Sequence, residues 1–431
     1  MKRISKIFPL LACSTLLFAC GGRQDAYKDG DSYDISSKGD GSVKATLHKI
    51  KNGFNLTVSG KGRTKSFDSE TDVQWHYISK RITQLTIKDG IQTIGNRMFY
   101  SLTSVQGTML PASITAIGVN GFNENFELYS LSATSVENHS GATIYLYKED
   151  MPEESDVYWR YKNGEPTVWS TIKMLFIGNS FTYYYDIPKL VEGLAKSANE
   201  MIAVDYVVQG AATLEDHSSH SSGTGLEIYN KLLSNNDFDF VILQEQSTSA
   251  YNAGYNTFKT AVTSLAKDVK QTQKNCEVRL YSTWAYDDAL YGEYDTIPKL
   301  EKLIRDSYIK CAVEVSNVDD VNFVGPAFSD VYTNHKNINL YYSDNKHQSM
   351  YGAYLSACVH ALSMIKDLNI DNTNFYGEKL GQYINQNDPS AQNPKNFGGG
   401  ISLEDAKTLI EVAKKTVKTY SINVDDDTEQ E

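Results

Sequence analysis

Cysteine is scarce in this chain, and its few copies form no pattern that binds metal or builds disulfides. Five cysteines occur in 431 residues, and Cys13 and Cys20 both lie at the N-terminal end. The remaining three, with no C-x-x-C pair among them, are Cys276, Cys311 and Cys358. An odd, scattered set predicts neither a disulfide framework nor a cysteine zinc site. We therefore expect buried thiols that pack as small hydrophobes.

The chain also lacks an excess of positive charge. Its formal net charge is −12, and it becomes −15 without Lys2, Arg3 and Lys6, the three cations of the first nineteen residues. A protein this acidic has no generic attraction for nucleic-acid phosphates or for anionic membrane surfaces. We expect no nucleic-acid partner.

The apolar run near the N-terminus is too short to cross a bilayer as a helix. Residues 7–18 supply about a dozen mostly apolar positions after the three cations, whereas a spanning helix needs ~20. This pattern predicts a secretory signal over residues 1–19. It ends in L-F-A-C-G-G, which resembles the lipobox of bacterial lipoproteins and implies lipidation of Cys20. The alternative is a plain signal peptide with an incidental cysteine.

The resemblance to a lipoprotein implies a location in the bacterial cell envelope. We expect the lipid to be the only contact with the membrane, at the outer membrane and facing the periplasm or the surface. The length of the chain predicts two domains. We assign 20–37 to a tether, 38–168 to a β-rich domain, 170–422 to an α/β domain and 423–431 to an acidic tail.

One internal repeat marks the first domain. The pattern I-x-x-I-G-x-x-x-F occurs at Ile91 to Phe99 and recurs 23 positions later at Ile114 to Phe122. A period near two dozen residues is typical of leucine-rich solenoids, and the segment resembles the BspA-like leucine-rich repeats of bacterial surface proteins. Such a module serves either as a spacer or in adhesion, and its partner stays open.

After residue 170 the pattern changes to alternating strands and helices. Apolar runs at 173–178, 203–208, 238–243, 278–282 and 321–325 are typical of buried parallel strands. Amphipathic stretches lie between them and after them, at 187–198, 226–233, 257–270, 297–314, 350–365 and 403–418. This alternation predicts a parallel sheet covered by helices on both faces.

Polar residues follow several of these predicted strands, where an open parallel sheet binds its ligands. Ser180 stands at a strand-to-helix turn, where its hydroxyl is exposed and its N–H can reach a developing oxyanion. Gly210 follows the second strand and lets the backbone approach a substrate. Gln244 and Gln246 follow the third and share a face, so either amide could reach the oxyanion; we favour Gln246.

A carboxylate and an imidazole stand late in the chain at a spacing that suits a triad. Asp344 precedes His347 by three residues in a loop before a predicted helix, so it can hold the ring in one tautomer while the other nitrogen accepts the Ser180 proton. An ordinary loop histidine is the alternative.

These segments together resemble the SGNH, or GDSL-like, hydrolase family over residues 172 to about 368. G-N-S-F-T is similar to its first block, Gly210 to its second-block glycine, and D-N-K-H to its fifth block. The resemblance implies a flavodoxin-like three-layer α/β/α fold, with Ser180 as nucleophile and neither cofactor nor metal. The usual third-block asparagine is absent: Q-E-Q-S stands there, as in a glutamine-variant branch whose substrates are poorly defined.

Four further residues near these loops are predicted to contact substrate. They are Asn179, Gln244, Trp284 and His217. The tyrosine-rich segments around the nucleophile and after Trp284 suit sugar rings or acyl groups, or simply pack. His217 and His220, with nearby acids, leave a metal site as a weaker alternative.

The sequence thus predicts a serine esterase that acts through an acyl-enzyme on O-acetyl or related groups of extracellular carbohydrate. One alternative is a non-catalytic surface lipoprotein that binds glycan or protein through a degenerate hydrolase domain. The other is a lipase or thioesterase on the same scaffold.

Overall fold

The computed structural model describes residues 27–132, 134–234, 237–371, 374–377, 380 and 400–422. The chain forms two compact units, and the division falls between Ser170 and Thr171. The predicted signal segment, Cys20 and the predicted tail at 423–431 lie outside the described residues. Within the described part of the chain, no helix is both long and apolar enough to span a bilayer.

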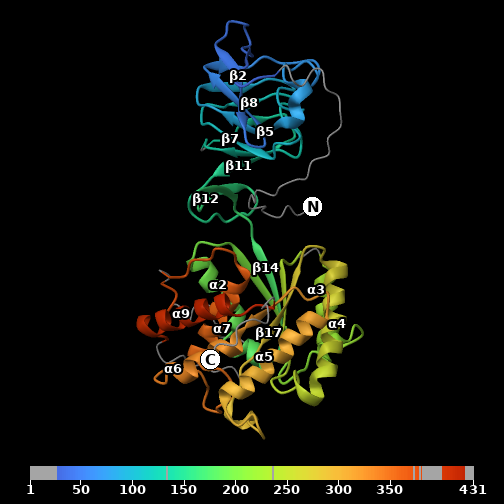
Figure 1. Cartoon of the computed structure of the whole chain (residues 1–431), viewed down its shortest axis with the longest axis vertical. Coiled ribbons are helices and arrows are strands. Elements are labelled where there is room, and N and C mark those ends of the chain that lie inside the picture. Colours follow the sequence, from blue (N-terminus) through green and yellow to red (C-terminus); the bar gives the residue numbers. More distant parts are fainter. Residues whose placement is uncertain are drawn as a thin grey trace. The chain divides into compact units, whose positions relative to one another are not determined.

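Unit 1 consists of short strands stacked in three sheets (Figure 1). Its elements are β1 (Ser32–Asp34), β2 (Val43–Ile50), β3 (Gly53–Gly60), β4 (Gly62–Arg63), the 3-10 helix η2 (His76–Arg81), β5 (Ile82–Ile87), β6 (Ile91–Ile94), β7 (Gly107–Leu110), β8 (Ala116–Ile117), β9 (Glu127–Ser130), β10 (Glu137–Asn138), β11 (Thr143–Tyr147), β12 (Tyr158–Lys162) and β13 (Glu165–Val168). The sheet orders are β1-β2-β3-β5, β10-β8-β6-β4 and β13-β12-β11-β9-β7. A smaller β-rich domain was predicted, and this is confirmed.

The 23-residue repeat sets the register of two neighbouring strands. β6 and β8 pair in parallel, with Ile94 opposite Ile117, its counterpart in the repeat. Both side chains are fully buried in the core of the unit. The same parallel ladder continues to β4 on one side and β10 on the other. The backbone stacking therefore extends one strand beyond the sequence motif at each end.

The assignment of residues 20–37 to a tether is wrong for its described part. β1 pairs antiparallel with β2, with Tyr33 opposite Ala45, and Ile35 is completely buried. Backbone hydrogen bonds and one apolar anchor hold this polar segment in the fold. Neither leaves a periodic signal in the sequence.

Unit 2 is an α/β domain (Figure 1). Its strands are β14 (Ile172–Gly178), β15 (Ile202–Val208), β16 (Phe240–Leu243), β17 (Glu277–Ser282) and β18 (Asp320–Phe323). Its helices are α1 (Ser180–Tyr183), α2 (Ile187–Ser197), α3 (Gly223–Leu233), α4 (Tyr255–Thr272), α5 (Ile297–Glu314), α6 (Val324–Asn334), α7 (Met350–Met364) and α9 (Leu403–Thr419). Short 3-10 turns are η3 (Asp216–Ser218), η4 (Asn252–Gly254) and η5 (Asp287–Ala289).

All five strands are parallel, in the order β15-β14-β16-β17-β18. Alternate side chains of β14 enter two separate cores: Met174 and Phe176 pack with α2, α6, α7 and α9, whereas Leu175 and Ile177 pack with α3, α4 and α5. Helices thus cover both faces of the sheet (Figure 1). The predicted three-layer α/β/α fold with flavodoxin-like strand order is confirmed.

The sequence missed α6. We expected residues 321–325 to be a strand, but β18 ends at Phe323 and α6 begins at Val324. A Cβ on Gly325 would lie 2.4 Å from the Thr283 carbonyl oxygen, so this helix start packs directly against the backbone that follows β17. That close contact is a tertiary feature, which an apolar run does not reveal.

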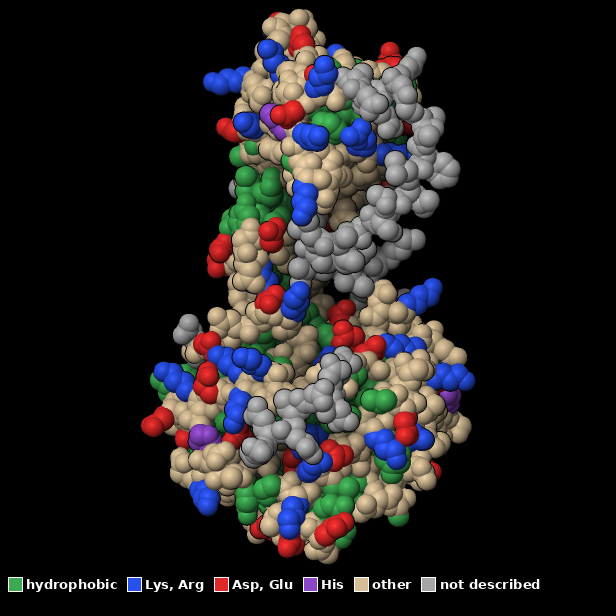
Figure 2. Space-filling view, in the orientation of Figure 1, with side chains coloured by type: hydrophobic (Ala, Val, Ile, Leu, Met, Phe, Trp, Pro, Cys, Tyr) green, Lys and Arg blue, Asp and Glu red, His purple; other side chains and the backbone are tan. Residues whose placement is uncertain are grey.

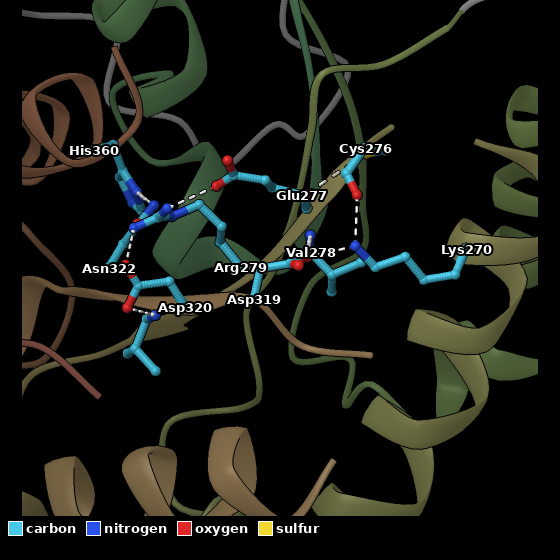
Figure 3. Close-up of polar contacts among 10 residues, drawn as sticks. Lys270, Cys276, Glu277, Val278, Arg279, Asp319, Asp320, Asn322 and His360 are labelled. Atoms are coloured by element: carbon cyan, nitrogen blue, oxygen red, sulfur yellow. Dashed lines mark hydrogen bonds and ion pairs between the residues drawn. The ribbon is translucent and has the colours of Figure 1, made fainter. Parts of the chain in front are cut away.

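A buried polar network fixes α7 to the sheet (Figure 3). Arg279 on β17 donates to Asn322 on β18 at 2.8 Å and pairs with Glu277 and Asp320 at 2.9 and 2.7 Å. The Asn322 amide in turn donates to Nδ1 of His360 on α7 at 2.8 Å. Burial, helped by Arg279, lowers the pKa of His360 to about 3, so the ring is neutral and accepts. This network anchors the helix that follows the His347 loop.

Charged side chains of both signs are mixed on the visible face of unit 2 (Figure 2). No broad field of one sign covers the described residues of that face.

Candidate active site

Ser180 opens α1, two positions after β14 ends at Gly178. A Cβ on Gly178 would lie 2.5 Å from Gln244 Oε1, so the turn requires glycine there. Asn179 caps the helix, and its Oδ1 accepts the Phe181 N–H at 3.1 Å. The first N–H groups of a helix have no partner within it. The Ser180 N–H is therefore available beside its own hydroxyl.

The side chains of Asp344 and His347 form one line of hydrogen bonds with Ser180, which lies more than 160 residues earlier in the chain. His347 Nε2 lies 2.8 Å from Ser180 Oγ, and His347 Nδ1 lies 2.5 Å from Asp344 Oδ2. Because a carboxylate only accepts, Nδ1 carries the proton and Nε2 accepts from the serine. The structure brings together the three residues that the sequence singled out.

The Asp344 carboxylate is held in its ionised form. Its Oδ1 accepts the backbone N–H groups of Lys346 and His347, both at 3.0 Å. Partial burial raises the pKa of Asp344, but the hydrogen bonds from the His347 ring and from these N–H groups outweigh it and leave the pKa below its ordinary value. A carboxylate of this kind fixes the tautomer and orientation of the imidazole.

Aromatic rings hold the His347 loop in place. The ring of Tyr184 stacks on His347 with centroids 4.2 Å apart. Trp284 donates its indole N–H to the Lys346 carbonyl at 3.0 Å and is sandwiched between Phe181 and Phe328, each at 4.3 Å. Tyr184 thus restrains the imidazole itself, and Trp284 restrains the backbone of the loop that carries it.

Gln348 is a positioning residue that the sequence analysis missed. It is fully buried, and its amide lies 3.3 Å from the Ser180 carbonyl, 3.2 Å from that of Phe181 and 3.0 Å from that of Tyr184. These carbonyls belong to α1 and its end, so the amide ties the histidine loop to the nucleophile turn. A polar residue directly before a buried helix was the available signal.

Gly210 lies beside the nucleophile helix. A Cβ added to it would lie 3.3 Å from the Tyr183 hydroxyl. The loop is fixed to the Ser180 turn, since the Asn179 amide donates to the Ala212 carbonyl at 2.8 Å. The structure thus ties the Gly210 loop to the turn that carries Ser180.

Gln246 engages its own turn. Its Oε1 accepts from the N–H and hydroxyl of Thr248 and from the Ser249 hydroxyl, at 2.9 to 3.0 Å. Its Nε2 donates to the Ser247 hydroxyl at 3.2 Å. In the described residues none of these bonds reaches Ser180 or His347. The amide keeps one further N–H for a ligand.

Glu245 is a second residue that the sequence analysis missed. It is 1% exposed and accepts the Gln246 N–H at 2.6 Å and the Leu214 N–H at 3.3 Å. Burial raises its pKa to about 7, against the lowering effect of these hydrogen bonds. The carboxyl connects the end of β16 to the Gly210 loop. An acidic residue between two glutamines was the only sign of it in the sequence.

The four predicted substrate contacts are all buried, and this corrects their assignment. Asn179 is 2% exposed, and Gln244, Trp284 and His217 are fully buried. Gln244 Oε1 accepts the Asn179 N–H at 2.8 Å, so it braces the turn. Their polar atoms satisfy backbone and side-chain partners inside the domain. In this structure they brace the turns around Ser180 and His347.

His217 and His220 have separate partners. His217 lies 2.9 Å from the Gly178 carbonyl and 2.8 Å from the Thr224 hydroxyl, and burial lowers its pKa. His220 pairs instead with Asp268 at 2.6 Å. The two imidazoles therefore do not face one ligand position, which removes the basis for the metal alternative at this pair.

A scan against protein-family models gives no match, and a search of curated proteins also gives none. The chain is similar to several solved structures. One is a DUF4886 family protein from Bacteroides uniformis, at 18% identity and a TM-score of 0.45, over 58% of this chain and 96% of that one. Another belongs to the lipolytic G-D-S-L family of Veillonella parvula, at 14% identity and a TM-score of 0.33, over 46% of this chain and 100% of that one.

A leucine-rich repeat protein from Eubacterium ventriosum is similar to 42% of this chain and to 45% of its own length, with 15% identity and a TM-score of 0.23. At such identities the chemistry of the site has to be argued from its own residues.

Proposed function

We propose that this protein is a serine esterase that hydrolyses O-acetyl or related acyl groups on extracellular carbohydrate. The observation that carries the proposal is the unbroken hydrogen-bonded line from the Ser180 hydroxyl through His347 to Asp344. Such a line activates a hydroxyl as a nucleophile at neutral pH. These side chains and water carry out both acylation and deacylation.

In acylation, Ser180 Oγ attacks the ester carbonyl while His347 Nε2 takes the hydroxyl proton. The tetrahedral intermediate carries its negative charge on the former carbonyl oxygen. His347 then returns the proton to the leaving alcohol as the ester C–O bond breaks. The products of this step are an acyl-Ser180 ester and the free sugar hydroxyl.

In deacylation, water attacks the acyl-Ser180 carbonyl and gives its proton to His347. The intermediate collapses, the bond to Ser180 Oγ breaks, and the proton returns to the serine. A carboxylic acid leaves. Asp344 keeps its negative charge throughout and stabilises the imidazolium in both halves of the cycle.

The oxyanion is stabilised by backbone donors, for which Ser180 N–H and Gly210 N–H are our candidates. Each such donor is worth ~3 kcal/mol in the transition state. Gln246 remains our candidate for the third donor, through the N–H that its turn leaves available. The Asn179–Ala212 hydrogen bond supports this arrangement because it holds the Gly210 loop against the nucleophile turn.

The decisive experiment compares hydrolysis of p-nitrophenyl acetate by the chain without the predicted signal segment 1–19 and by its Ser180→Ala variant. We expect the variant to lose at least ~1000-fold in kcat, as loss of a triad nucleophile does. Equal rates would overturn the proposal and favour the binding protein with a degenerate site. Activity that rises steadily with acyl chain length would instead favour a lipase or thioesterase.

A further inference from the structure

Two loops at the carboxyl edge of the sheet carry four tyrosines, one of which packs beside neighbours of the catalytic residues. One loop follows β16 and contains η4; the other follows β17 and contains η5. We call Tyr251, Tyr286, Tyr291 and Tyr294 the tyrosine wall. Nothing in the acyl-enzyme cycle uses these residues.

Tyr286 joins the wall to the catalytic residues. Its ring packs edge-on against Phe181, the neighbour of the nucleophile, with centroids 6.2 Å apart. The ammonium of Lys346, the neighbour of His347, lies 5.4 Å from the centre of the same ring. The Tyr286 hydroxyl pairs with the Ser247 hydroxyl at 3.0 Å. The wall therefore begins at residues adjacent to Ser180 and His347.

The outer end of the wall is a tight hairpin. Tyr291 and Tyr294 exchange backbone N–H···O bonds of 3.1 and 2.9 Å, and Gly292 at its tip has φ +52, which glycine adopts without strain. The two rings lie 5.5 Å apart at 57°. Tyr291 is 41% exposed, and its hydroxyl accepts from the Asn252 amide of the other loop. The hairpin thus presents an accessible aromatic ring that is fixed at its polar end.

Tyr251 connects the two ends. It lies between Ser247 and Asn252 in the first loop, whose hydrogen bonds to the Tyr286 and Tyr291 hydroxyls join the two loops at two points. Tyr251 and Tyr286 are 5% and 4% exposed and form the support. Tyr291 and Tyr294 form the surface that a ligand can touch.

We propose that the tyrosine wall is a subsite for a pyranose ring of the acylated carbohydrate, an inference that rests on the proposed esterase function. A pyranose has C–H faces that stack on aromatic rings and hydroxyls around its rim. The wall offers both complements, because the Asn252 amide borders the exposed Tyr291 ring and the Lys346 ammonium lies over the Tyr286 ring. An acyl chain would require a continuous apolar lining, which these polar groups interrupt.

The experiment uses the whole exported protein and its Tyr291→Ala variant. The probes are acetylated xylo-oligosaccharides and acetylated manno-oligosaccharides, with p-nitrophenyl acetate as a substrate that has no sugar. We expect kcat/KM for at least one acetylated oligosaccharide to fall ~10-fold, mainly through KM, because one stacking contact is lost. The p-nitrophenyl acetate rate should stay unchanged. Tyr332→Ala on α6, where the side chain is 44% exposed, is the matched control.

The outcomes separate this inference from the esterase proposal. If Tyr291→Ala lowers kcat/KM equally on all substrates, or lowers it on none, the sugar subsite is ruled out while the esterase proposal stands. If the wild type hydrolyses nothing, titration calorimetry with xylohexaose and mannohexaose decides the question. Binding that Tyr291→Ala weakens supports the wall alone, and absence of binding by the wild type overturns it.

Discussion

Single residues decide whether the site can carry out general-base chemistry. His347 is held at three places: Nδ1 on Asp344, Nε2 on Ser180, and its ring face against Tyr184. Each contact removes one freedom of the imidazole, namely its tautomer, its distance from the hydroxyl and its tilt. A ring restrained in this way pays little entropy when it takes up the serine proton.

The first prediction concerns Gln246, the proposed third oxyanion donor. We expect Gln246→Ala to lower kcat for p-nitrophenyl acetate ~100-fold with little change in KM, because an oxyanion donor acts mainly in the transition state. Steady-state kinetics measures this. Thr248→Val serves as control, since it perturbs the same turn without removing the amide. An unchanged kcat in Gln246→Ala would leave the oxyanion to the backbone donors alone.

The second prediction concerns the buried carboxyl of Glu245. Burial raises its pKa from 4.5 to about 7 in the folded protein. The folded state therefore keeps a proton that the unfolded state has lost, and stability falls as pH rises between these two values. Over that window the loss amounts to about 3 kcal/mol. Glu245→Gln mimics the protonated acid and should therefore abolish this loss of stability with rising pH.

Thermal unfolding of the wild type and Glu245→Gln, at pH 5 and pH 8, checks this. We expect similar stability at pH 5 and a more stable variant at pH 8. Glu227→Gln, at an exposed position on α3, controls for a change of net charge. A variant that is less stable at both pH values would mean that the ionised carboxylate is needed by the N–H groups of Leu214 and Gln246.

At the scale of elements, α7 and the loop before it work as one piece. The helix is anchored at its far end by the Asn322–His360 contact and at its near end by Gln348, which reaches three carbonyls of the α1 segment. Trp284 adds a hydrogen bond from the turn after β17. The distance between nucleophile and base is therefore set by contacts among three separate elements.

We predict that Gln348→Ala destabilises the protein and loosens the contact between the loop before α7 and the α1 segment. The carbonyls of Ser180 and Phe181 keep the Tyr184 N–H and the Tyr281 hydroxyl as donors, but the Tyr184 carbonyl loses the Gln348 amide, which costs about 2 kcal/mol of unfolding free energy. The freed loop should also lower kcat for p-nitrophenyl acetate by at least ~10-fold. Denaturant unfolding and kinetics on the same preparation measure both effects. Loss of stability with full kcat would show that Trp284 and Tyr184 alone position His347.

At the scale of the whole molecule, the chain combines two units with different construction. Unit 1 stacks parallel and antiparallel strands around a main core and a smaller aromatic cluster, and unit 2 places helices on both faces of one sheet. The proposed chemistry lies entirely within unit 2. The proposed lipid attachment at Cys20 lies before the first described residue of unit 1.

The last prediction tests that attachment. In a bacterial host, Cys20→Ser should move the protein from the membrane fraction to the soluble fraction and abolish incorporation of labelled palmitate, because acyl chains anchor an otherwise soluble protein. The p-nitrophenyl acetate activity should be unaffected. Cys13→Ser, within the same apolar segment, is the control. Membrane retention without label in Cys20→Ser would contradict the lipoprotein hypothesis.

The sequence by itself determined the elements and the chemistry-bearing residue types. Apolar runs and helical periodicity located the sheet and helices of unit 2, because both patterns are local and follow from the side-chain repeat of strands and helices. The chain order Ser180, Asp344, His347 and the three-residue spacing of the last two can also be read directly from the sequence. The polar segment of β1 has no such pattern and was not predicted, whereas α6 was missed although Val324, Ala327, Phe328 and Val331 have helical spacing.

Only the tertiary structure decided which of the polar and aromatic residues at the strand ends are buried. Trp284 and Asn179 stand at strand ends as substrate contacts would, yet packing against distant segments buries both. Gln348 and Glu245 gained their roles because α1 and the Gly210 loop come close to them in space. Burial depends on neighbours that are remote in sequence, so no local pattern can report it.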